Sequence, residues 1–261
     1  MIAGKGGTGK TTIAACLSFL LADMGYNVIA LDTDSVPNLA LSLGIPRDIA
    51  EKIVPLAQNE ELVEERTGAR PGSGWGVLFS LTPRVDDIAD KYGIRVRDNL
   101  KLVVVGSIDA SKQGCLCPAI ALARHFLRHT LMSPRDIVVV DAEAGAEVFG
   151  RGLAEYFDFM FCICEPTVKS ILIGMKLVRL ARELNVKNNV IVVNKVRSVF
   201  DAERMCDKIV GDSIPWHIIR YDDNVVRAEM EGYGLDKIPR DSVIFLDLKT
   251  LIKRFMPWLI K

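Results

Sequence analysis

The sequence carries no excess charge of either sign, because 33 Lys and Arg residues balance 33 Asp and Glu residues among 261. Proteins that bind nucleic acid without sequence preference need surplus Lys and Arg on one face to neutralise the phosphates. We therefore expect no nucleic-acid partner. Hydrophobic residues make up 49% of the chain and charged residues 25%, which is the composition of a globular protein with an ample core.

The chain also lacks long apolar runs and has little cysteine. The most apolar stretch near its start, residues 13–22, ends at Asp23; it is too short to span a membrane and begins too late for a secretory signal. Six cysteines are too few to stabilise a chain of this length by disulfide bonds. We expect free thiols, a cytoplasmic location and no membrane partner.

Short apolar runs alternate with segments of helical periodicity. The strand-like runs cover residues 28–31, 100–105, 137–140, 159–164 and 190–193. The helix-like segments cover residues 10–24, 118–131, 168–184 and 202–210. Because the runs are nearly continuous, they indicate strands buried on both faces. The order predicts an α/β fold, a doubly wound and mostly parallel sheet with helices on both faces.

We expect a single domain over residues 1–261, with an insertion at about 44–99. Within the insertion, the pattern predicts one helix over residues 47–66 and a short strand over 77–81. The first strand would cover only residues 1–3, whereas central parallel strands usually have about five or six residues. This shortness suggests that residues are missing before Met1.

A glycine-rich segment follows this first strand. It matches the phosphate-loop pattern G-x-x-x-x-G-K-[ST] between a strand and a helix, with the residues Gly4, Lys5, Gly6, Gly7, Thr8, Gly9, Lys10 and Thr11, followed by Thr12. Glycines let backbone N–H groups surround phosphate oxygens. We expect Lys10 to reach the β- and γ-phosphates and Thr11 to bind Mg²⁺.

Polar residues end three of the later strands. Asp32 and Asp34 lie two residues apart at one strand end, and Asp141 ends another, all at the sheet edge where ligands of such folds bind. Asn194 resembles the first residue of the N-K-x-D pattern that reads guanine, but Arg197 occupies the Asp position. A guanidinium cannot accept hydrogen bonds. We therefore expect Asn194 to contact adenine and the nucleotide to be ATP.

The pattern K-G-G-x-G-K-T-T at residues 5–12 resembles the deviant Walker A motif of the MinD/ParA/nitrogenase-iron-protein class of dimeric ATPases. The resemblance implies a homodimer in which Lys5 crosses the interface to the partner's phosphates. It further implies that Asp34 activates the attacking water, that Asp32 and Asp141 help to hold hydrated Mg²⁺, and that Gly145 lies in the switch that senses the γ-phosphate.

A second motif, Cys115-Leu116-Cys117-Pro118, precedes a helical segment and places Cys117 at the predicted cap. A helix N-terminus stabilises thiolates, which are good ligands for soft metals. One pair supplies two ligands, so a four-ligand site needs a second protomer. This combination resembles the CooC-type accessory ATPases of carbon monoxide dehydrogenase, which implies Ni²⁺ or Zn²⁺ at Cys115 and Cys117 and a nickel enzyme as client.

Two other functions fit the same ATPase class. One is a positioning or partitioning ATPase that switches on a membrane surface, for which the amphipathic residues 243–261 would serve as a targeting helix. We expect this segment instead to be a helix docked on the core, because amphipathic terminal helices usually face the core. The other is an iron–sulfur-carrying ATPase like the nitrogenase iron protein. Cys162 and Cys164 lie in an apolar run and are expected to be core residues.

Overall fold

The computed structural model describes residues 1–34, 38–72, 78–106, 117–131, 136–142 and 156–260. Its strands are β1 (Ile2–Gly4), β2 (Val28–Asp32), β3 (Ile94–Arg97), β4 (Leu100–Val104), β5 (Ile137–Asp141), β6 (Phe159–Cys164), β7 (Asn188–Val196) and β8 (Trp216–Arg220). Its longer helices are α1 (Lys10–Asp23), α4 (Glu60–Thr67), α6 (Cys117–Leu131), α7 (Val168–Glu183), α8 (Val199–Ile209), α9 (Asp223–Glu231) and α10 (Val243–Phe255). Short helices are α2 (Leu39–Ser42), α3 (Arg47–Ala50) and α5 (Ile88–Lys91), with 3₁₀ turns at Leu56–Gln58, Leu235–Lys237 and Pro257–Leu259.

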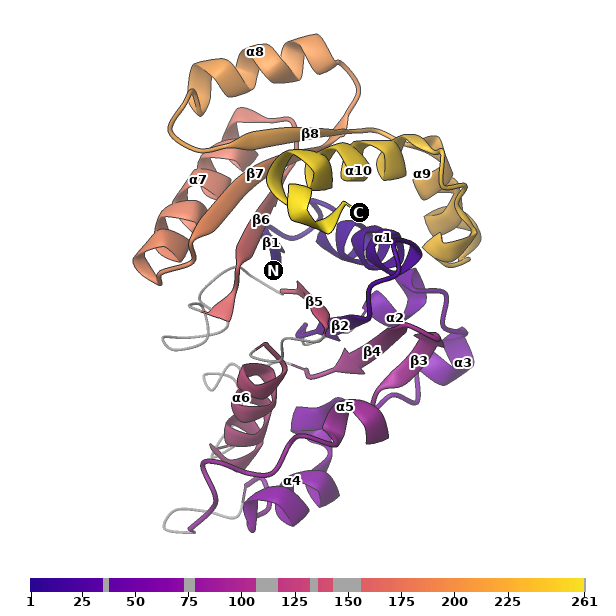
Figure 1. Cartoon of the computed structure of the whole chain (residues 1–261), viewed down its shortest axis with the longest axis vertical. Helices are drawn as coiled ribbons and strands as arrows, with labels where there is room; N and C mark the ends of the chain where they lie inside the picture. The colour runs from indigo at the N-terminus through magenta and orange to yellow at the C-terminus, as the bar shows by residue number, and fades with distance from the viewer. Residues whose placement is uncertain (35–37, 73–77, 107–116, 132–135, 143–155, 261) are drawn as a thin grey trace.

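The strands form one eight-stranded sheet in the order β3-β4-β2-β5-β1-β6-β7-β8 (Figure 1). All neighbouring pairs are parallel except β3 and β4. The strand that leads into the glycine-rich loop therefore lies near the middle of the sheet, between β5 and β6. This arrangement confirms the predicted doubly wound, mostly parallel α/β fold.

Helices cover both faces of the sheet and divide the core into two layers (Figure 1). One layer contains apolar side chains of α4, α6, α7 and α8, and the other those of α1, α2, α9 and α10. Alternate residues of the strands point into each layer, which explains why the strand sequences are continuously apolar. Polar residues lie instead at the carboxyl edge, the edge of the sheet at which the parallel strands end.

The region predicted as an insertion differs from the expected pattern. The single helix predicted over residues 47–66 is wrong: α3 ends at Ala50, and α4 begins only at Glu60. Pro55 lies between them; proline lacks an amide hydrogen and cannot continue a helix. Leu78–Leu81 is not a strand, while Val77 is outside the described residues. The sheet instead receives the antiparallel strand β3 from this region.

Two elements near the C-terminus were not predicted, namely β8 and α9. The β8 sequence contains Trp216, His217 and Arg220 and lacks a clear apolar pattern. Both ends of α9 have residues that are typical of helix caps. At its start, the Asp222 side chain accepts a hydrogen bond from the Asn224 amide, and at its end Gly232 adopts a φ of 72°. Sequence reasoning could have found this helix.

The C-terminal helix α10 packs on α1 and β8. Ile244, Leu248, Leu251 and Ile252 are buried in one core layer, so the amphipathic segment docks on the core. The helix ends at Phe255, before Pro257. In the described part of the chain, none of the helices has the length and apolar character needed to cross a membrane.

The two edge strands of the sheet, β8 and β3, are protected in different ways. At β8, the Arg220 amide donates to Asp247 Oδ2 at 2.8 Å, and the Trp216 carbonyl accepts from Arg254 at 3.2 Å, so α10 caps backbone groups of the edge strand. At the other end, β3 is short and charged, and its Arg97 pairs with Asp23. Such devices keep edge strands from pairing with other chains.

Candidate functional site

The glycine-rich loop connects β1 to α1 at the carboxyl edge of the sheet. Gly4 packs against β6 so closely that a Cβ there would lie 2.3 Å from the Ile163 carbonyl oxygen. Gly9 precedes α1 with a φ of 92°, a conformation that side chains disfavour. Both positions therefore require glycine. The loop delivers the first N–H groups of α1 to the edge, as an anion-binding site requires.

The two lysines of the loop lie in different environments. Lys10 is buried, with only 9% of its surface exposed, and its ammonium donates to the Lys5 carbonyl at 3.4 Å. The same carbonyl accepts the Thr8 hydroxyl at 2.9 Å. The Lys5 side chain is exposed. Lys10 is thus directed into its own loop, whereas the side chain of Lys5 is accessible to another molecule.

Carboxylates gather beside the loop, because Asp32 and Asp141 are register partners at the ends of β2 and β5. The buried Asp32 carboxylate accepts the amides of Asp34 and Leu39, each at 3.0 Å, which holds the start of the segment after β2. Burial raises the pKa of Asp32 to about 6. Thr33 donates to the Asp141 backbone carbonyl at 2.9 Å and fixes the two strand ends together.

Asp141 is the most unusual of these carboxylates. Burial raises its pKa to about 7, while a hydrogen bond from Thr11 and the charge of Lys10 act in the opposite direction. Among the described residues, its Oδ1 has no hydrogen-bond partner. A buried oxygen without a hydrogen-bond partner lowers the stability of the folded protein unless another group bonds to it.

The oxygen-bearing side chains around Asp141 are of the kind that binds Mg²⁺. Mg²⁺ prefers oxygen ligands and is usually held by one or two carboxylates together with substrate phosphates. Thr11 and Asp141 would hold the ion, with Asp32 behind them, and Mg²⁺ would neutralise charge on the phosphates. Asp34 is partly buried, and its charge acts on both Asp32 and Asp141; its role as the base for the attacking water stays a prediction.

The opposite side of the loop is held by the end of β7. The Asn194 amide nitrogen donates to the Thr8 carbonyl at 2.9 Å, and the Lys195 ammonium donates to the Gly7 carbonyl at 2.7 Å. The Arg197 guanidinium lies 3.7 Å from the centre of the Tyr221 ring. Asn194 was predicted to contact adenine, which stays a prediction; its contact with the loop was not foreseen.

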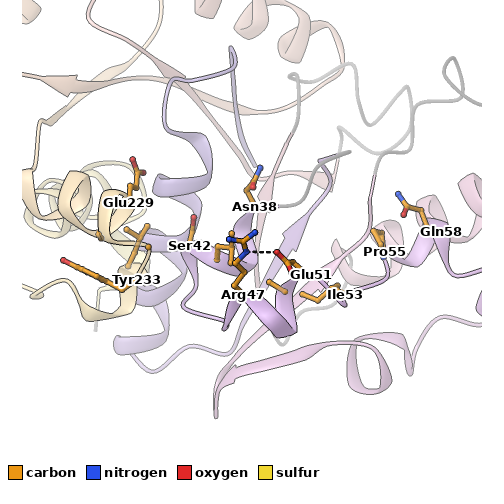
Figure 2. A pocket seen from close by; sticks show the side chains of 14 residues that line it. Asn38, Ser42, Arg47, Glu51, Ile53, Pro55, Gln58, Glu229 and Tyr233 are labelled. Atoms are coloured by element: carbon orange, nitrogen blue, oxygen red, sulfur yellow. Dashed lines mark hydrogen bonds and ion pairs between the residues drawn. The ribbon is translucent and has the colours of Figure 1, made fainter.

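Thr12 points to a different neighbour, since its hydroxyl donates to Glu229 of α9 at 2.9 Å. Glu229 lies on the wall of a groove of about 750 Å³ between α9 and the segment containing α2 and α3 (Figure 2). Asn38 lines the groove from the segment that follows Asp34, and an Arg47–Glu51 ion pair crosses its other wall. The groove thus borders the loop without including it.

The predicted thiol site falls mostly outside the described residues. Cys115 and Gly145 lie outside them, and for Cys117 the structure gives the backbone only: α6 begins at this residue, one position earlier than predicted. In the described ranges, no group of three or more His, Cys, Asp and Glu side chains is placed to hold a metal ion. Cys162 and Cys164 are buried free thiols, as predicted.

Comparison with known proteins agrees with this geometry. Residues 1–235 match the family described as the CobQ/CobB/MinD/ParA nucleotide binding domain. The carbon monoxide dehydrogenase accessory protein CooC of Rhodospirillum rubrum is 34% identical over 264 residues, covering 98% of this chain and 97% of the relative. An ATP-binding protein of Methanocaldococcus jannaschii is 40% identical over 234 residues, 88% of each chain.

Among solved structures, the septum site-determining protein MinD of Pyrococcus horikoshii OT3, complexed with Mg-ADP, has a similar fold. Its TM-score is 0.66 at 22% identity, with 97% of this chain and 93% of that chain covered. The chain therefore belongs to the MinD/ParA family of P-loop ATPases, as the motif at residues 5–12 predicted.

Proposed function

We propose that this protein is an ATP-dependent homodimeric metallochaperone that carries Ni²⁺, or Zn²⁺ in its place, and assists nickel insertion into a carbon monoxide dehydrogenase. The metal is cargo, held by Cys115 and Cys117 of both protomers. The sequence relative CooC, whose name describes a carbon monoxide dehydrogenase accessory protein, supports this choice over the other functions of the family.

The observation that carries the proposal is the position of the start of α6. This helix connects β4 to the parallel strand β5 and therefore runs opposite to the strands. Its first residue, Cys117, consequently lies at the carboxyl edge, the same edge as the phosphate loop. One two-fold axis through this edge can bring together both the cysteine pairs and the Lys5 side chains of two protomers.

Ligand counting gives the stoichiometry. Each chain has one C-x-C pair, and a tetrahedral site needs four ligands, so one ion per two chains follows. In this scheme ATP favours the closed dimer because Lys5 reaches the partner's phosphates. Hydrolysis removes the γ-phosphate and that contact, so the dimer relaxes and the shared thiolates change their geometry.

Equilibrium titration with Ni²⁺ and with Zn²⁺, read beside the mass from light scattering, tests the proposal. We expect one ion per two chains. Binding should weaken at acid pH, because thiols must lose their protons to become ligands. A Cys115→Ala/Cys117→Ala double variant should lose this site.

The matched control is a Cys162→Ala/Cys164→Ala variant, which removes two buried thiols that lie in the core. It should keep the metal site and lose only packing energy. One ion bound per monomer, or unchanged binding in the Cys115→Ala/Cys117→Ala protein, would rule out a shared site.

A further inference from the structure

The carbonyl groups on the β7 side of the phosphate loop are held by side chains that follow one another in the sequence. Asn194 donates to the Thr8 carbonyl at 2.9 Å, and Lys195 donates to the Gly7 carbonyl at 2.7 Å. Asn194 is buried with 5% of its surface exposed, so its contact is protected from water. Two consecutive peptide groups of the loop are thus fixed by one strand end.

The close contact between Asn194 and the loop requires glycine at position 9. A Cβ on Gly9 would lie only 2.5 Å from the Asn194 amide nitrogen, so any larger residue would displace the amide. The backbone of Lys195 is itself strained, with a φ of 61° that few residues other than glycine adopt. Strain of this kind persists where the surrounding structure enforces it, and it concentrates at functional sites.

The direction of these carbonyls sets the direction of the neighbouring amides. In a planar trans peptide, the C=O of one residue and the N–H of the next point to opposite sides. When Asn194 holds the Thr8 carbonyl toward β7, the Gly9 N–H is turned away from β7. Phosphate binding by a loop of this type requires inward-facing N–H groups.

We propose that Asn194 and Lys195 are positioning residues that hold the phosphate loop in its binding conformation through the Thr8 and Gly7 carbonyls. The Lys195 ammonium also lies 4.0 Å from Glu165 Oε1, at the end of β6, which keeps its long side chain over the loop. In this role Asn194 acts on the loop through its amide nitrogen, which is separate from its predicted contact with adenine. The inference rests on nucleotide binding by this family and is independent of metal delivery.

Inorganic tripolyphosphate with Mg²⁺ is the decisive probe, because it has phosphates and no base. Calorimetric titration of the full chain should show that Asn194→Ala and Lys195→Met each raise the Kd for tripolyphosphate about tenfold, as expected for one lost hydrogen bond, and that Lys195→Met raises the Kd for ATP by the same factor. In Lys195→Met the ratio of ATP to GTP affinity should not change. The control is Lys187→Met, an exposed lysine just before β7, which should bind as the wild type does.

The alternatives give different results. If Asn194 served only the base, Asn194→Ala would lose ATP affinity and keep tripolyphosphate affinity, which would overturn the proposal. Since Asn194 is buried, its variant could also lose stability, so Lys195→Met, at a side chain that is 46% exposed, gives a second test of the same role. Unchanged tripolyphosphate binding in Lys195→Met would equally overturn it.

Discussion

The charge state of Asp141 connects stability to ligand binding at the scale of one residue. Its pKa is raised to about 7 by burial, against an ordinary value of about 4 in an unfolded chain. Well below pH 4 the carboxyl is neutral in both states, so its ionisation does not affect the free energy of unfolding. As the pH rises toward 7, the unfolded chain releases the proton first, so the free energy of unfolding falls.

We therefore expect Asp141→Asn to stabilise the protein at pH 8 in the absence of Mg²⁺ and nucleotide, by roughly 2–4 kcal/mol. At pH 5 the difference should be smaller, less than half of that at pH 8, and it should vanish near pH 3, where the carboxyl is neutral in both states. The variant should bind Mg·ATP at least about tenfold more weakly, since a carboxamide is a poor replacement for a charged ligand. Urea unfolding from pH 8 down to pH 3 measures the first effect, and calorimetry the second.

The exposed Asp241 supplies the control for this prediction. Asp241→Asn should change neither the pH dependence of unfolding nor nucleotide affinity. Equal stability of Asp141→Asn and the wild type at pH 8 would show that the charge of this buried carboxyl is compensated within the protein.

Individual site residues differed in how far they could be predicted. Asp32 and Asp141 were predictable, because strands of a parallel sheet end at one edge and their last polar residues meet there. The contacts of Lys195 with Gly7 and of Thr12 with Glu229 were not, since 188 and 217 positions separate the partners. A motif describes residues near one another in sequence; these contacts depend on strand order and helix placement.

Elements with strong periodicity were predicted well, and those with mixed sequence were not. The run over residues 159–164 coincides with β6, whereas the helix predicted over 47–66 breaks around Pro55. The β8 strand was missed because its position at the sheet edge allows polar residues such as His217 and Arg220. Tertiary position, more than local preference, determined that strand.

The docking of α10 gives a prediction at the scale of elements. Leu248 of α10 is fully buried against the core, whereas Leu246 on the same helix is 44% exposed. We expect Leu248→Ala to lower the free energy of unfolding by about 3 kcal/mol, and Leu246→Ala to change it by less than about 0.5 kcal/mol. Urea unfolding of both variants measures the difference.

The same packing bears on the alternative of a membrane-positioning ATPase. An amphipathic helix binds a lipid surface through its apolar face, and in α10 that face is already covered by α1 and β8. Co-sedimentation with anionic vesicles should leave the ATP-bound protein in the supernatant. Vesicle binding that Leu246→Asp abolishes would instead favour the positioning function.

At the scale of the whole molecule, the two loop lysines should separate binding from assembly. Lys10→Ala should abolish ATP binding, because the buried ammonium serves its own loop. Lys5→Ala should bind ATP nearly as the wild type does, yet remain monomeric and lose hydrolysis, because the exposed Lys5 would act across the interface. ATP affinity, phosphate release and light-scattering mass distinguish the two.

Lys52→Ala, at another exposed lysine, is the control and should dimerise and hydrolyse ATP normally. If Lys5→Ala hydrolysed ATP at the wild-type rate, the lysine would have no role in trans. The dimer would then have to be explained by other residues at the carboxyl edge.

The capped ends of the sheet limit how copies of this protein can add to one another. Asp247 and Arg254 each hold a backbone group of β8, and β3 is short and charged, so both edge strands are protected against pairing with another chain. These features disfavour assembly of copies by continuation of the sheet. In the proposed dimer, contact through the carboxyl edge would use the same face of both molecules, so assembly would close at two subunits.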